Sequence, residues 1–175
     1  MKTPSQTKAL IKLQELKTAY QKHIRENFEH KAKDCLSCPT QGACCTDAHF
    51  VNVHITRLEA VAIRQTLGKL GEKRAREVLY RVAKTIEDYN LTAGDTFAQK
   101  FACPLFEKGT GCLVHFEGKP APCIAHACYE NREDLPPDEI QTEVENRIER
   151  LNRMVYRQNP RWLPLPVWLS LISNE

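Results

Sequence analysis

Eight cysteines dominate the chemistry available to this chain of 175 residues. They form an early group and a late group: Cys35, Cys38, Cys44 and Cys45, then Cys103, Cys112, Cys123 and Cys128. Thiolate sulfur is a soft ligand that suits zinc and iron. The two-residue spacing of Cys35 and Cys38 brings two sulfurs within reach of one ion. We therefore expect all eight side chains to be metal ligands.

Eight thiolates fit more than one arrangement. They suffice for two four-coordinate sites, for one iron-sulfur cluster with a separate zinc site, or for one cluster with four spare thiols. Adjacent side chains of an extended segment point to opposite sides, so Cys44 and Cys45 are expected to face different metal centres. The alternatives to metal are disulfides and redox thiols, and a reducing compartment disfavours the former.

Four of the six histidines lie close in sequence to cysteines. They are His49, His54, His115 and His126. Because eight thiolates already fill the coordination positions, we expect these imidazoles beside the metal rather than on it, with His126 the first candidate for a ligand. Asp34 and Asp47 flank the early cysteines and fit turn or capping positions.

The elements that must position these loops are mostly helices. Apolar residues recur every three or four positions over about 6–30, 56–70, 72–89 and 137–158, which predicts amphipathic helices. Thr56 and Glu59 have the spacing of a capping box at the start of the second helix. Residues 50–55 suggest a short strand. The apolar tail 161–175 is expected to pack against the first helix, the alternative being a partner-binding segment.

These elements predict a mainly α fold, a single small helical domain over 1–175 with two irregular cysteine-rich loops. The metal-binding region spans 35–128. Apolar residues make up 42% and charged residues 27% of the chain, enough apolar side chains for a core.

Charge and motifs argue against several functions. The net charge of +3 is too small for a typical nucleic-acid-binding surface. No apolar run is long enough for a membrane span or a signal-peptide core, so we expect no membrane association and a cytoplasmic location. Hydrolase, kinase and dinucleotide-binding motifs are missing, so we assign no catalytic residues and favour a non-enzymatic role.

The cysteine pattern resembles the YkgJ family, also called the CxxCxxCC family, over residues 35–128. The resemblance rests on the first cysteine pair, Gly42-Ala43-Cys44-Cys45, Cys103-Pro104-Leu105, Gly111-Cys112 and the Pro-x-x-Cys ending at Cys123. Where that family has two arginines around the last motif, this chain has Lys119 and Ile124. Membership implies a domain that chelates zinc or iron.

An all-thiolate site without an open position favours a structural or metal-handling role, with zinc or iron as the cofactor and the surface offered to a protein partner. The alternative function is an iron-sulfur redox protein that transfers electrons or assists an oxidoreductase.

Overall fold

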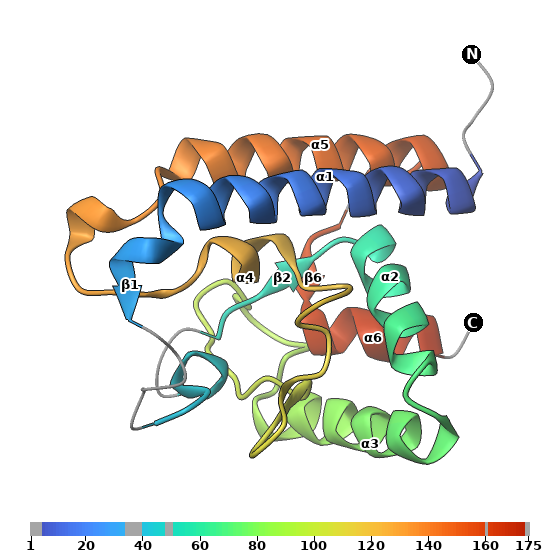
Figure 1. The fold of residues 1–175 in the computed structure, drawn as a ribbon. Coiled ribbons are helices and arrows are strands. Elements are labelled where there is room, and N and C mark those ends of the chain that lie inside the picture. Colours follow the sequence, from blue (N-terminus) through green and yellow to red (C-terminus); the bar gives the residue numbers. More distant parts are fainter. Residues whose placement is uncertain (1–4, 34–39, 48–50, 160, 174–175) are drawn as a thin grey trace. The chain divides into compact units, whose positions relative to one another are not determined.

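The computed structural model describes residues 5–33, 40–47, 51–159 and 161–173, and this part of the chain is mainly helical (Figure 1). The predicted fold class is therefore confirmed. The chain divides into two compact units, each made of segments distant in sequence. The first unit contains residues 1–39 and 120–160, and the second contains residues 40–119 and 161–175. The single domain over 1–175 stays a prediction.

The first unit is built on two long helices. Helix α1 (Gln6–Asn27) and helix α5 (Asp138–Tyr156) lie side by side and run in opposite directions (Figure 1). Short elements complete this unit: η1 (Glu29–Lys31), β1 (Ala32–Lys33), α4 (Ala121–Ala125), β5 (Cys128–Tyr129) and η3 (Arg132–Asp134). Strands β1 and β5 pair antiparallel, with Lys33 opposite Cys128.

The apolar stripe predicted for the first helix is its buried face. Leu13, Tyr20 and Ile24 are buried on α1, as are Val144 and Ile148 on α5. Helix α1 also contacts α4, which carries one of the late cysteines. The stripe ends slightly earlier than predicted, because the backbone tightens into the 3₁₀ turn η1 after Asn27.

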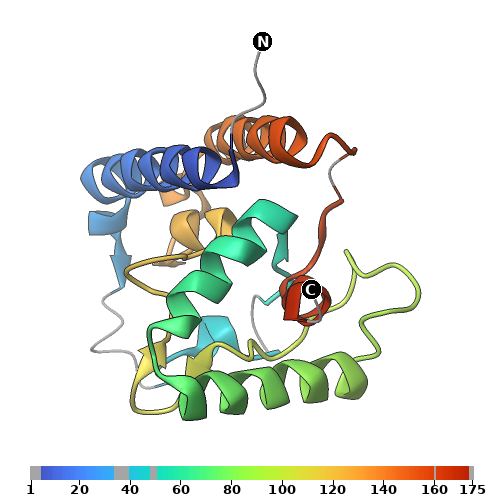
Figure 2. The same ribbon diagram turned by 90° about the vertical axis from the view of Figure 1, so that its right-hand side faces the viewer.

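The second unit packs three helices around short strands. Helix α6 (Leu165–Ser173) contacts both α2 (Arg57–Gly68) and α3 (Glu72–Asp88), as Figure 2 shows from the side. The other elements are η2 (Ala43–Cys45), β2 (His54–Ile55), β3 (Phe106–Glu107), β4 (Gly111–Cys112) and β6 (Leu163–Pro164). Strand β2 pairs with β6, and β3 pairs with β4, both antiparallel.

The apolar tail is part of the core of the second unit. Leu165, Trp168, Leu169 and Ile172 of α6 are buried. Packing was the expected outcome, but the partners are α2 and α3, whereas the first helix belongs to the other unit. The predicted strand over 50–55 is shorter than expected: residue 50 lies outside the described residues, and the strand β2 comprises His54 and Ile55, although the Val53 carbonyl also accepts from the Leu165 N–H.

The capping box at Thr56 is confirmed. The Thr56 hydroxyl accepts from the Glu59 backbone N–H, and a Glu59 carboxylate oxygen accepts from the Thr56 N–H. Both side chains are fully buried, so water cannot replace either bond.

We predict that Thr56→Ala lowers the free energy of unfolding by about 1 kcal/mol, the usual cost of losing a cap. Thr56→Ser keeps the hydroxyl and should retain most of that stability. Urea denaturation of the three proteins measures the difference. Equal midpoints for Thr56→Ala and the parent would contradict this prediction.

Candidate metal centre

The six described cysteines divide between the two units. Cys44, Cys45, Cys103 and Cys112 belong to the second unit, and Cys123 and Cys128 to the first. All six are half-buried thiols. Cys35 and Cys38 lie outside the described residues. The second unit therefore holds four of the described cysteines and the first unit holds two.

Cys44 and Cys45 lie on one tight turn. The 3₁₀ segment η2 is closed by the Cys45 N–H, which donates to the Gly42 carbonyl at 2.7 Å. Gly42 precedes the turn with a φ of +77°, a conformation that favours glycine. The two sulfur atoms are 4.0 Å apart. The expectation that these side chains point apart was wrong, because it assumed an extended backbone.

The late cysteines of this unit frame a hairpin. Phe106 is opposite Cys112, and Glu107 is opposite Gly111. Gly109 and Gly111 both have positive φ, which lets the chain reverse within three residues. The prediction of an irregular loop here was incomplete, because the two glycines between Glu107 and Cys112 indicate a hairpin.

Two contacts join the turn to the hairpin. The Cys103 N–H donates to the Cys45 carbonyl at 2.9 Å. Gly42 lies against the ring of Phe106, so close that an added Cβ would overlap ring atoms. The absence of a side chain at Gly42 therefore lets the early loop dock beside the residue that pairs with Cys112.

Backbone amides point at two of the sulfurs. The N–H groups of Leu105 and Phe106 donate toward the Cys103 sulfur, and the Val114 N–H donates toward the Cys112 sulfur. Each cysteine also begins a turn, since the N–H of the residue three positions later, Phe106 or His115, donates to the cysteine carbonyl. Such amide dipoles lower the pKa of a thiol because they stabilise the thiolate.

The four thiols lie close enough to influence one another. Burial raises the pKa of Cys103 to about 12, and the sulfurs of Cys112 and Cys44 add to this effect. The pKa of Cys45 is raised first by its hydrogen bond with Cys44, then by burial and by the charges of its sulfur neighbours Cys44, Cys103 and Cys112. Without a cation, this group resists ionisation.

One lysine lies near the set. Burial raises the pKa of Cys112, while the positive charge of Lys119 opposes this rise. Lys119 thus stands where the resembled family has an arginine, and it supplies one positive charge to the thiol cluster.

Helix α3 holds the hairpin through two arginines that sequence reasoning missed. Arg81 Nε donates to the Pro104 carbonyl at 3.0 Å, and another Arg81 nitrogen contacts a Glu107 carboxylate oxygen at 2.9 Å. Arg74 binds the second oxygen of the same carboxylate. The hydrogen bond from Arg74 is the main reason that the pKa of Glu107 is below its ordinary value. The hairpin is fixed at both Pro104 and Glu107.

The chemistry of these donors fits zinc or iron. The four thiols lie at half-buried positions on two loops that a backbone hydrogen bond joins, with amide donors directed at two of the sulfurs. In the described ranges, no three His, Cys, Asp or Glu side chains already stand as a closed ligand set. To form a closed ligand set, the thiol side chains must converge. They can do so by rotating between staggered rotamers.

The histidine and aspartate candidates have other positions. His54 is buried and stacks on Phe97, with ring centroids 4.0 Å apart, and its Nε2 is 3.1 Å from the Thr96 hydroxyl. Burial lowers the pKa of His54, which favours the neutral ring. Asp47 accepts a hydrogen bond from Tyr89 at 2.6 Å. His49 and Asp34 lie outside the described residues.

The remaining candidate ligands are His115 in the second unit and three residues of the first unit. His115 directly follows the turn after Cys112 and packs edge-on against Phe116. Cys123 lies on α4, His126 ends that helix, and Cys128 begins β5. All three are half-buried. The short helix and strand thus place Cys123, His126 and Cys128 within one compact unit.

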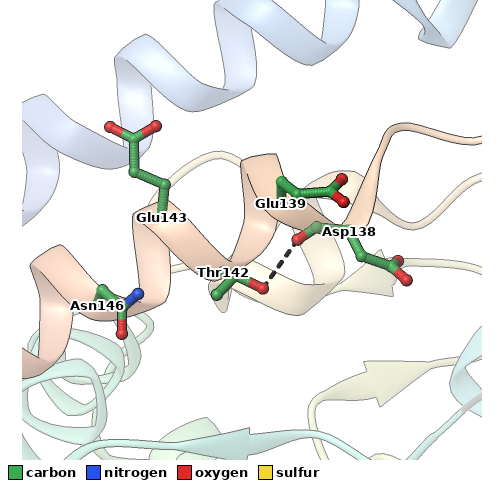
Figure 3. A pocket seen from close by; sticks show the side chains of 5 residues that line it. All are labelled: Asp138, Glu139, Thr142, Glu143 and Asn146. Atoms are coloured by element: carbon green, nitrogen blue, oxygen red, sulfur yellow. Dashed lines mark hydrogen bonds between the residues drawn. The ribbon is translucent and has the colours of Figure 1, made fainter.

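Open depressions on the first unit do not coincide with the thiols. One depression, shown in Figure 3, is lined by residues of the first turns of α5: Asp138, Glu139, Thr142, Glu143 and Asn146. The Thr142 hydroxyl there donates to the Asp138 carbonyl of the preceding turn, a bond within the helix. The other is lined by Glu130, Asn131, Arg132 and Glu133. Neither has a thiol or an imidazole in its lining.

Comparison with known proteins adds no relative. No helix in the described part of the chain is long and apolar enough to cross a membrane. No family model matches the chain, and neither a curated protein nor a solved structure matches it.

Proposed function

We propose that this chain is a metal-binding protein that chelates zinc or iron through cysteine thiolates and uses the ion in a structural or metal-handling role. The observation that carries the proposal is that two loops of the second unit, joined by the bond from the Cys103 N–H to the Cys45 carbonyl, carry four thiols, those of Cys44, Cys45, Cys103 and Cys112. Four soft ligands are what a closed zinc or iron site requires.

Other observations support the proposal. Burial raises the pKa values of Cys103 and Cys112, and the hydrogen bond with Cys44 raises that of Cys45, with the charges of neighbouring thiols adding to each rise. Thiolate formation is therefore costly unless a cation compensates for the negative charge. Backbone N–H groups directed at Cys103 and Cys112 would share the remaining negative charge of bound thiolates. The ordered match to the YkgJ cysteine pattern supports the same function. Cys35, Cys38, Cys123 and Cys128 remain proposed ligands.

The second candidate is an iron-sulfur redox protein. Amide hydrogen bonds to cluster thiolates adjust the reduction potential, and Cys103 receives two of them. Under either function, thiolate ligands favour a reducing compartment, and we place the protein in the cytoplasm. A protein partner is also part of the proposal, and Phe116, which is 91% exposed just beyond Cys112, offers it an aromatic contact.

The direct test is removal of one ligand. Cys103→Ser and Cys112→Ser should each lose bound metal and lower the melting temperature by more than 5 °C, an estimate of about 2 kcal/mol for a domain of this size. Ala102→Ser, directly before Cys103, changes size and polarity without removing a thiol and serves as the control. Elemental analysis of anaerobically purified protein, with an ultraviolet-visible spectrum, measures the metal and its type.

Full metal content in either cysteine variant would remove that residue from the ligand set. A parent protein without metal, even after incubation with zinc or with iron and sulfide, would contradict the function itself. A colourless zinc protein would support the first candidate, and a brown protein that contains iron and sulfide would support the second.

The docking of the early loop gives another prediction. Gly42→Ala adds a methyl group that must push the Phe106 ring away, whereas Gly109→Ala has a similar positive φ but nothing within 4 Å of the new carbon. Both variants incur backbone strain. Gly42→Ala should cost about 1 to 3 kcal/mol more, the usual range for overpacking, and should also weaken zinc binding. Denaturation and competition with a chelator compare the two, and equal losses would contradict the docking role.

The arginine pair on α3 predicts a pH dependence. Because the pKa of Glu107 is lowered in the folded protein, its stabilising effect is complete above the unfolded pKa and is lost as the pH falls through the folded pKa. Glu107→Gln should therefore lower the melting temperature at neutral pH, with a difference from the parent that shrinks in acid. Glu117→Gln, in a more exposed pair with Lys69, is the control and should change little. A difference constant from pH 7 to acid would contradict the role assigned to this pair.

A further inference from the structure

We infer that Cys44 and Cys45 bind the same ion, together with Cys103 and Cys112, in one mononuclear tetrahedral site. The inference rests on the proposed function and deepens it. It states which thiolates share an ion and that the site holds one metal atom. It replaces the expectation that the adjacent cysteines serve separate centres.

The backbone of the η2 turn makes shared ligation possible. Side chains that follow one another in a strand point to opposite faces, but a 3₁₀ helix has three residues per turn, so neighbours diverge by about a third of a rotation. Two hydrogen bonds fix the turn: the Cys45 N–H donates to the Gly42 carbonyl, and the Thr46 hydroxyl donates to the Ala43 carbonyl at 2.9 Å. Because this divergence is smaller than in a strand, both sulfurs can reach the same ion.

The sulfur separation agrees with one ion. Zinc–sulfur bonds of ~2.3 Å in a tetrahedron place neighbouring sulfurs about 3.8 Å apart. Cys44 and Cys45 sulfurs are already 4.0 Å apart. In a four-iron cluster each iron takes one cysteine, which sets the sulfurs of different ligands on different metal atoms. The close pair thus favours a single ion over a four-iron cluster.

The remaining two ligands are linked to this pair through the backbone. Cys103 is tied to Cys45 by its N–H bond to the Cys45 carbonyl. Cys112 lies on the second strand of the hairpin, opposite Phe106. Phe106 is only three residues after Cys103 in the sequence. The charge of Cys44 acts on Cys45, Cys103 and Cys112, which agrees with the placement of these thiols on loops that the backbone joins. Four thiolates complete the coordination of a tetrahedral ion without a fifth ligand.

Cadmium in place of zinc tests this inference on the unaltered chain. Cadmium binds thiolates as zinc does, and an NMR-active cadmium isotope shows through-bond correlations to the β-protons of the cysteines that ligate it. We expect the β-protons of Cys44, Cys45, Cys103 and Cys112 to correlate with a single cadmium resonance. Correlation of Cys44 and Cys45 with different resonances, or coupling between two cadmium ions there, would overturn the inference and leave thiolate metal binding intact.

Zinc stoichiometry of variants provides the second measurement. Cys44→Ser and Cys45→Ser should each lose the same ion, so that the double variant loses no more than either alone. Ala43→Ser, on the same turn, keeps all thiols and should retain the parent's zinc. A double variant that loses one ion more than each single variant would overturn the inference.

The outcomes separate this inference from the proposed function. A chain that binds neither zinc nor cadmium contradicts both. A brown chain with a cluster of two or four irons ligated by these cysteines overturns the mononuclear site, while the binding of metal by thiolates stands.

Discussion

Crowding of sulfur is the constraint on which the second unit depends. Burial and the charges of neighbouring thiols both oppose the ionisation of Cys45, Cys103 and Cys112. The surroundings offer little compensation: Lys119 acts on Cys112, amide dipoles act on two sulfurs, and Arg74 and Arg81 are engaged with Glu107. In the proposed function the ion supplies the missing positive charge, because a bound cation is often the largest local charge in such a site.

The short strands of this unit cannot position the thiols alone. An isolated two-stranded hairpin is marginal in water, and β3 and β4 have two residues each. Helix α3 compensates by holding the hairpin at Pro104 and Glu107. In addition, the close contact between Gly42 and the Phe106 ring positions the early loop. The arrangement of the thiols is thus set by residues that are not themselves thiols.

The helices were predictable from sequence because their signals are local. The stripe Leu13–Tyr20–Ile24 repeats at helical intervals, and the cap at Thr56 involves side chains only three residues apart. The site was only partly predictable. Cysteine identities named the candidates, but the turn at Cys44 and Cys45 depends on the positive φ of Gly42 and on the distant Phe106 ring. The Arg81–Pro104 bond joins residues with no shared pattern, so it had no signal in the sequence.

The discontinuous make-up of the units has a consequence for folding. In the sequence, α6 of the second unit comes after residues 120–160, which belong to the first unit. Strand β2 pairs with β6, so that His54 lies opposite Pro164. Closing so long a loop is entropically costly, and contacts of high sequence separation slow folding. The residues from Thr40 to Lys119 are synthesised well before α6, so the cysteine-bearing loops leave the ribosome while Ile55, Leu58 and Ile63 still lack their apolar cover. During that interval the nascent chain exposes thiols and core side chains together, so under the proposed function its synthesis sets the order in which metal binds and the core closes.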